Sequence, residues 1–308
     1  MQNRKPKPQP KHGAQPSHHP KHVHEVVDPR WIISALGAML LLAVLCAWIA
    51  VCALFYRGQW QLVLQPSRTV ATTPAQTGLS FTEVHFAVDA TGQPQLDGWW
   101  IPSDSPSRPT ALLLHSGQGS ISDALPTAQT LHDAQLNVLL FDYRGFGRSL
   151  GRHPTQSLMQ ADADSALHYL TETRNIPLSS IVVFGTGAGA SPAVALCVAH
   201  NEIPALILLN PDGDFKSRIS QDQRSRMVPT SLLFNQNFPL AAPLQTLKTP
   251  KLLLTFTTGS APQNLQQAAD PKTTVEFPSN DQQALHQAIT RFLPTYLPQA
   301  PPTRTPAP

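Results

Sequence analysis

Cysteine and charged residues are scarce in this chain, which has 308 residues. Its three cysteines are Cys46 and Cys52, in a long apolar segment, and Cys197, in a predicted helix. Their number and placement predict no disulfide framework. Charged residues make up 13% of the chain, and the formal net charge of +3 comes from an excess of Lys and Arg in residues 1–30. The remainder is near neutral, which argues against a nucleic-acid-binding surface over the folded part.

Large apolar side chains are almost absent from residues 1–30, which are rich in Pro, Lys, Gln and His. Such a segment cannot bury enough surface to offset its chain entropy, so we predict a disordered basic tail. A weak metal-binding tail is an alternative interpretation of its histidines, which are His12, His18, His19, His22 and His24. Their spacing does not resemble a closed metal site, so we predict neither a metal nor a cofactor. The proline-rich residues 298–308 are also predicted to be disordered.

Charge is absent from the apolar run between Trp31 and Phe55. Its length of about 25 residues is enough to span a bilayer with some tilt. A cleaved signal peptide would have an apolar core of about 7–15 residues and a small-residue cleavage site, so a retained signal anchor over 31–56 is favoured. Six basic residues precede the span, whereas only Arg57 and Arg68 follow it closely. The positive-inside rule then predicts a single-pass protein with a cytoplasmic N-terminus and an extracytoplasmic domain, whose partner over 31–56 is the bilayer.

Short apolar strands alternate with helical segments beyond a predicted linker at 57–78. Strands are expected at 80–88, 95–101, 110–115, 137–141, 180–184, 205–209, 251–256 and 273–277, and helices at 123–134, 156–173, 188–200, 261–268 and 281–293. This order predicts an α/β domain over 79–297, with a mostly parallel sheet covered by helices on both faces. The first two strands could form an antiparallel edge. Residues 211–249 lack a clear strand and are expected to be a small insertion over the carboxyl edge of the sheet.

A turn of small residues follows the strand at 180–184, and its sequence is Gly185-Thr186-Gly187-Ala188-Gly189. This is the layout of a nucleophile elbow, G-x-S-x-G, in which a strand turns sharply into a helix. The central residue of an elbow is normally a serine whose hydroxyl attacks the substrate. Here it is Gly187, which has no side chain and cannot act as a nucleophile.

Two further motifs accompany the elbow. One is His115-Ser116-Gly117-Gln118-Gly119 at a strand end, and the other is Phe141-Asp142-Tyr143-Arg144-Gly145-Phe146-Gly147-Arg148-Ser149. With these motifs, residues 79–297 resemble the α/β-hydrolase fold superfamily, and more narrowly the membrane-anchored bacterial hydrolases of the BEM46 and serine-aminopeptidase-like group. The resemblance implies a bacterial cytoplasmic membrane location and a vestigial oxyanion loop at His115, Ser116 and Gly117. It also implies a bracing loop with Asp142, Arg144 and Arg148, although these charges could instead bind an anionic ligand.

Hydrolysis in that family depends on a triad in the chain order Ser, Asp or Glu, His. Gly187 occupies the serine position. The acid would follow the strand at 251–256, where residues 257–263 contain no carboxylate, and the histidine would fall within Pro278-Ser279-Asn280-Asp281, which contains none. Possible substitutes are Thr186, Ser191, Asp212, Asp214, His115 and His286, but a structural role is favoured for each.

The vacant triad predicts a membrane-anchored, catalytically degenerate α/β-hydrolase-like protein with a binding, scaffolding or regulatory role. A divergent active esterase or peptidase with relocated catalytic residues is one alternative. A non-enzymatic structural protein of the envelope is the other. The sequence leaves open which small molecule or protein is bound.

Overall fold

The computed structural model describes residues 28–88, 92–93, 95–105, 107–221, 227–257, 263–278 and 281–297. Most of the predicted N-terminal tail, with its five histidines, and all of the C-terminal tail lie outside these residues. The chain divides into two compact units, residues 1–50 and 51–308. Helix α1 (Pro29–Gly58) is described throughout and buries none of its residues. Its length and composition are those of a helix that can cross a membrane.

The second unit contains a sheet of eight strands in the order β10-β9-β8-β7-β4-β6-β3-β2. Their bounds are Thr82–Phe86 (β2), Leu96–Ile101 (β3), Thr110–Leu114 (β4), Asn137–Phe141 (β6), Ile181–Thr186 (β7), Ala205–Leu209 (β8), Lys251–Phe256 (β9) and Lys272–Phe277 (β10). Strand β3 pairs antiparallel with β2 and β6, and the other neighbours are parallel. All eight predicted strands and the antiparallel edge are therefore confirmed.

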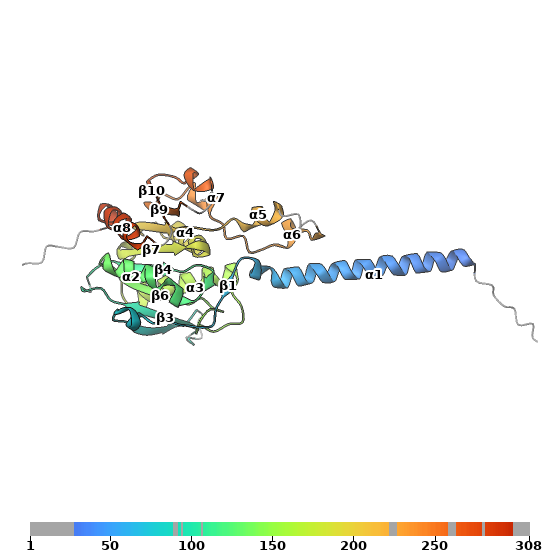
Figure 1. Cartoon of the computed structure of the whole chain (residues 1–308), viewed down its shortest axis with the longest axis horizontal. Coiled ribbons are helices and arrows are strands. Elements are labelled where there is room, and N and C mark those ends of the chain that lie inside the picture. Colours follow the sequence, from blue (N-terminus) through green and yellow to red (C-terminus); the bar gives the residue numbers. More distant parts are fainter. Residues whose placement is uncertain are drawn as a thin grey trace, which may run out of the picture. The chain divides into compact units, whose positions relative to one another are not determined.

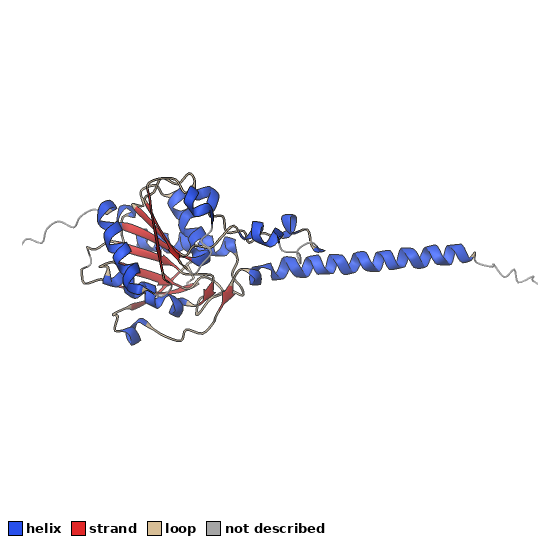
Figure 2. Ribbon diagram, turned by 45° about the horizontal axis from the view of Figure 1, so that its top comes forward, coloured by secondary structure: helices blue, strands red, loops and turns tan. Residues whose placement is uncertain are grey.

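Helices cover both faces of this sheet (Figure 2). One core contains side chains of α3 (Gln156–His168) and α4 (Ala190–Ala199). The other contains side chains of α2 (Leu125–Asp133) and α8 (Gln282–Tyr296). Strand β4 supplies both cores, because successive side chains of a strand point to opposite faces: Leu112 enters the first core and Leu113 the second. Fully apolar strands are the consequence of burial on both faces.

Residues 57–78 are packed within the second unit, unlike the linker predicted from the sequence. Gln59 and Leu64 are buried. The short strand β1 (Gln65–Pro66) pairs in parallel with β5 (Gln118–Gly119), whose residues belong to the predicted oxyanion loop. The turns η1 (Gln59–Leu62) and η2 (Pro74–Thr77) flank it. The sequence did not reveal this packing because the pairing uses backbone groups, which any residue supplies.

The described parts of the predicted insertion, 211–221 and 227–249, contain three short helices and no strand. These helices are α5 (Phe215–Gln221), α6 (Thr230–Leu233) and α7 (Ala241–Leu244), all labelled in Figure 1. The Asp212 backbone N–H donates to the Gly187 carbonyl at 2.9 Å, which fixes the start of the insertion beside the elbow. The insertion thus begins at the carboxyl edge of the sheet, where α/β folds bind their ligands.

Candidate functional site

The elbow forms where β7 ends and η6 (Gly187–Gly189) leads into α4. Gly187 has φ +52°, in the left-handed region that side chains other than glycine rarely adopt. A Cβ at Gly189 would overlap the carbonyl oxygens of Leu114 and His115, so the helix can approach the sheet only with glycine at this position. The backbone therefore has the sharp strand-to-helix turn of a nucleophile elbow without its nucleophile.

The predicted oxyanion loop lies directly against the elbow. A Cβ placed on Gly187 would be 2.9 Å from the Cβ of Ser116. Ser116, Gly117 and Ala188 all line the same cavity. In an active elbow the oxyanion is held by the N–H of the residue after the nucleophile and by an N–H of this loop. Ala188 and Ser116 occupy those two positions.

A cavity of about 840 Å³ lies over the elbow, within the range of roughly 300–1,000 Å³ that is typical of small-molecule sites. Its wall combines the elbow, the loop at Ser116 and the insertion. The polar residues that line it are Ser116, Gln118, Thr186, Asn210, Asp212, Asp214, Ser217 and Arg218. In the described part of the chain, this lining includes no histidine, cysteine or lysine. Asp212 and Asp214 are therefore the candidate general bases in this described lining.

The two aspartates of the lining already have partners. The Asp212 carboxylate lies 2.7 Å from the Arg218 guanidinium. The Asp214 carboxylate accepts hydrogen bonds from the backbone N–H groups of Leu240, at 3.3 Å, and Ala241, at 2.9 Å. Asp214 therefore holds the two ends of the insertion together, and Asp212 forms an ion pair at the rim of the cavity.

Among the residues that the structure describes, the other possible substitutes do not form a nucleophile–base pair either. Ser191 is buried, and its Oγ donates to the Pro239 carbonyl at 2.9 Å. Thr186 lines the cavity, but the described lining offers it no histidine. His286 lies on α8, outside the cavity lining. Among the residues that the structure describes, no group of three or more His, Cys, Asp or Glu side chains is placed to hold a metal ion.

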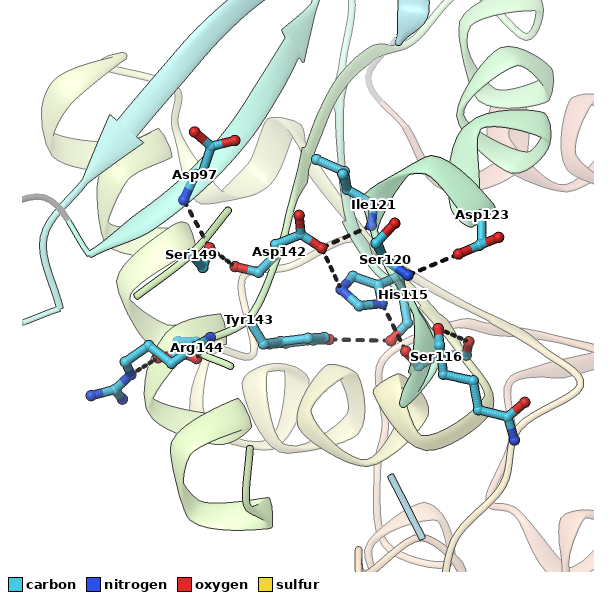
Figure 3. A network of polar contacts seen from close by, with 12 residues as sticks. Asp97, His115, Ser116, Ser120, Ile121, Asp123, Asp142, Tyr143, Arg144 and Ser149 are labelled. Carbon is cyan, nitrogen blue, oxygen red and sulfur yellow. Dashed lines mark hydrogen bonds and ion pairs between the residues drawn. The ribbon is translucent and has the colours of Figure 1, made fainter. Parts of the chain in front are cut away.

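His115 lies outside the cavity lining and points toward Asp142, and both side chains are almost fully buried (Figure 3). Its Nε2 lies 3.8 Å from Asp142 Oδ1, and its Nδ1 lies 2.7 Å from the Ser116 carbonyl oxygen. Burial lowers the pKa of His115 to about 4 and raises the pKa of Asp142 to about 7. The Ile121 backbone N–H donates to Asp142 Oδ1 at 2.8 Å. His115 and Asp142 therefore link the loop at Ser116 to the end of strand β6.

The two arginines of the same motif form ion pairs within the domain. Arg144 Nε lies 2.5 Å from Oδ1 of the buried Asp162, and the Arg144 backbone N–H donates to Oδ2 at 2.7 Å. Arg148 lies 2.9 Å from Glu83, with both side chains about half exposed. Neither arginine lines the cavity. The sequence did not single out Asp162, because nothing local distinguishes it from Asp164 on the same helix.

Two of the three triad positions fall largely on residues that the structure leaves undescribed. The acid position covers 257–263, of which 258–262 lie outside the described residues, and the histidine position includes 279–280, which also lie outside them. At these two positions only the sequence shows that the triad residue is missing. At Gly187 both the sequence and the structure show it.

Residues 105–294 match the family model described as serine aminopeptidase, S33. Protein bem46 of Schizosaccharomyces pombe is 33% identical over 159 residues, which cover 50% of this chain and 52% of the relative. The alpha/beta hydrolase domain-containing protein WAV2 of Arabidopsis thaliana is 30% identical over 170 residues, which cover 53% of this chain and 54% of the relative. The chain thus matches about half the length of these curated relatives.

Solved structures share the fold at low sequence identity. An esterase of Pyrococcus furiosus superimposes with a TM-score of 0.60 at 19% identity, over 77% of this chain and 99% of the esterase. An alpha-beta hydrolase from Vibrio vulnificus has a TM-score of 0.57 at 21% identity, over 70% of this chain and 81% of that protein. The fold, the motifs and the family match agree: this chain belongs to the serine aminopeptidase S33 family of α/β-hydrolase proteins.

Proposed function

We propose that this chain is a membrane-anchored, catalytically degenerate member of its family, which binds a ligand over the elbow without hydrolysing it. The observation that carries the proposal is Gly187 at the apex of an intact elbow, with φ +52°. Acyl transfer by this fold needs a nucleophile that a base activates. Glycine has no atom for this step, and the described cavity lining contributes no histidine.

The cavity is the feature that supports a binding role. It retains a volume of about 840 Å³ and a mixed lining, in which Phe215 and Leu240 lie beside the Asp212–Arg218 ion pair. A site of this kind can accept the apolar part of a small molecule and orient its polar part. Loss of the nucleophile removes turnover while leaving such a site in place.

The proposed location is a cytoplasmic membrane of a bacterium, with the domain outside the cytoplasm. Helix α1 supplies a candidate span. The basic excess before it, against Arg57 and Arg68 after it, supports this orientation. The domain would then encounter extracytoplasmic ligands.

The test is active-site labelling of the full chain in detergent with a fluorophosphonate probe, beside an active serine hydrolase as positive control. We expect no labelling, because the chain has no activated hydroxyl at position 187. Intact-mass analysis measures the stoichiometry, and peptide mapping locates any adduct. Stoichiometric labelling at Ser116, Thr186 or Ser191 would instead establish a divergent active hydrolase.

A binding measurement completes this test. Short-chain nitrophenyl esters carry an apolar acyl group and a polar ester, which match the mixed lining of the cavity. We expect members of such a series to raise the Tm of the full chain without release of nitrophenol. Turnover would contradict the degenerate site, whereas a Tm that no ester moves would contradict this ligand chemistry.

A further inference from the structure

A buried glutamine joins the end of α1 to the insertion. Gln59 follows the last residue of α1 and is 2% exposed. Its Nε2 donates to the Tyr56 carbonyl at 3.0 Å and to the Leu233 carbonyl at 3.1 Å. Its Oε1 accepts from the Asn235 backbone N–H at 2.7 Å. The side chain therefore clamps the last residue of α6 and the backbone just after it, although 174 residues separate Gln59 from Leu233.

The segment beyond this clamp is held in place on its other side. The Gln156 backbone N–H donates to the Gln236 side chain at 2.7 Å, and the Phe238 backbone N–H donates to the Gln156 side chain at 2.8 Å. Ser191 donates to the Pro239 carbonyl. Helix α6 thus has a fixed position with respect to residues 56–59, within the same compact unit.

Exposed apolar side chains gather in the two segments that Gln59 joins. Among the described residues after α1, five large hydrophobic side chains are exposed, and they are Leu62, Leu150, Val198, Met227 and Leu232. Leu62 lies in the turn that contains Gln59, and Met227 and Leu232 lie in or beside α6. Leu232 is 81% exposed, the largest value among them. Three of the five are thus in the two segments that the Gln59 side chain holds together.

The distance from Gln59 to the predicted hydrocarbon region is short. Phe55 is the last residue of the apolar run, and four helical residues advance by about 6 Å. The polar interfacial layer of a bilayer is roughly 5–8 Å thick on each side. Since the Gln59 side chain contacts Leu233 directly, the neighbouring Leu232 is within reach of that layer.

We infer that the α6 segment, residues 227–235, is a second membrane contact of this chain, which places Leu232 at the boundary between headgroups and acyl chains. The partner is the bilayer that α1 spans, so the inference rests on the membrane anchoring in the proposed function. Amphipathic surface elements bind bilayers by burying leucine and aromatic side chains at this depth. Gln59 fixes the segment at the height where this burial can occur.

Depth-dependent quenching tests the inference. Leu232→Cys is introduced into the full chain with Cys46→Ala and Cys52→Ala, while the buried Cys197 is retained. The new thiol carries a nitrobenzoxadiazole label, and the protein is placed in phosphatidylcholine nanodiscs with or without doxyl-labelled lipid. The matched control is Val198→Cys, which is also exposed but lies at the end of α4, about 15 Å of helix away from the elbow.

We expect blue-shifted emission at position 232 and doxyl quenching several-fold greater than at position 198. Equal quenching at the two positions, in protein that remains incorporated in the nanodiscs, would overturn the bilayer contact and leave the anchor intact. A label at 232 with blue-shifted emission that doxyl lipid does not quench would indicate contact with a protein partner or a second copy of this chain. This result would also overturn the inference. Failure of the chain to incorporate would overturn the anchoring together with this contact.

Discussion

Ser116 and Gly187 face each other across the floor of the cavity, and a Cβ on Gly187 would lie 2.9 Å from the Ser116 Cβ. The oxyanion loop therefore occupies part of the space that a nucleophile's side chain would need. Because the near atom of Ser116 is a Cβ attached directly to the backbone, relief of the contact requires the loop itself to move. The oxyanion loop can therefore lie this close to the elbow because Gly187 has no side chain.

Gly187→Ser is expected to give no ester or peptide hydrolysis above background. A serine hydroxyl is a weak nucleophile without a base within about 2.6–3.2 Å, and the described lining contains no histidine. The measurement is single-turnover hydrolysis by the full chain, compared with a variant that combines Gly187→Ser, Ser260→Asp and Asn280→His. Turnover by Gly187→Ser alone would reveal a working base nearby, with His115 and His286 as the first positions to test.

Gly187→Ala is the matched control for the backbone. Both substitutions add a Cβ at φ +52° and near Ser116, so each is expected to lower the free energy of unfolding by about 1–3 kcal/mol. Denaturant unfolding of both variants measures this cost. If neither variant loses stability, the loop at Ser116 moves freely and the close packing at the elbow has no energetic consequence.

Asp142→Asn is expected to become more stable relative to the wild type as pH rises from about 4 to about 7. Burial raises the pKa of Asp142 from 3.8 to about 7. The native state thus binds this proton more tightly than the unfolded state, and the resulting stability is present below pH 3.8 and lost as pH rises through about 7. Asparagine stays neutral throughout.

Denaturant unfolding of the two proteins at several pH values measures the difference between their free energies of unfolding. We expect this difference to change by about 1–3 kcal/mol over the pH range. The comparison cancels the shared ionisable groups that do not interact with Asp142. A difference that is flat with pH, or that runs in the opposite direction, would show that Asp142 is ionised in the native state at low pH.

Gln59→Leu is expected to loosen the segment after α6. The substitution removes the partner of the Asn235 N–H and of the Leu233 carbonyl, and each of these part-buried hydrogen bonds contributes about 0.5–1.5 kcal/mol. Hydrogen exchange at residues 233–235 should become faster. The control is Gln61→Leu, two residues further along and exposed, which should leave this exchange unchanged. Equal effects of both variants would contradict the role of Gln59 as a clamp.

Alkaline phosphatase fused after residue 298 is expected to be active, because this enzyme folds only after export and the charge distribution predicts an extracytoplasmic domain. A fusion directly after Arg30 lacks the span and should remain inactive in the cytoplasm. An inactive fusion after residue 298, in protein that is present in the membrane, would reverse the orientation. The fold of the domain does not depend on this outcome.

The sequence by itself determined the elements of the fold and the loss at the elbow. Apolar runs such as Thr110–Leu114 and Asn137–Phe141 are local patterns, and burial on both faces of a parallel sheet requires them. Gly187 could be identified because small residues between a strand and a helix have a fixed order in an elbow. These features depend on neighbours in the chain, so a local pattern is sufficient to find them.

Only the tertiary structure decided which polar groups pair with each other. Gln59 and Leu233 are 174 residues apart, and Gln59 differs from the exposed Gln61 only by where it lies in the fold. Asp162, rather than Asp164, meets Arg144, and His115 lies beside Asp142 and outside the cavity lining. A buried polar group takes whichever partner the packed chain brings within hydrogen-bonding distance, and this choice depends on long-range contacts that have no local signature in the sequence.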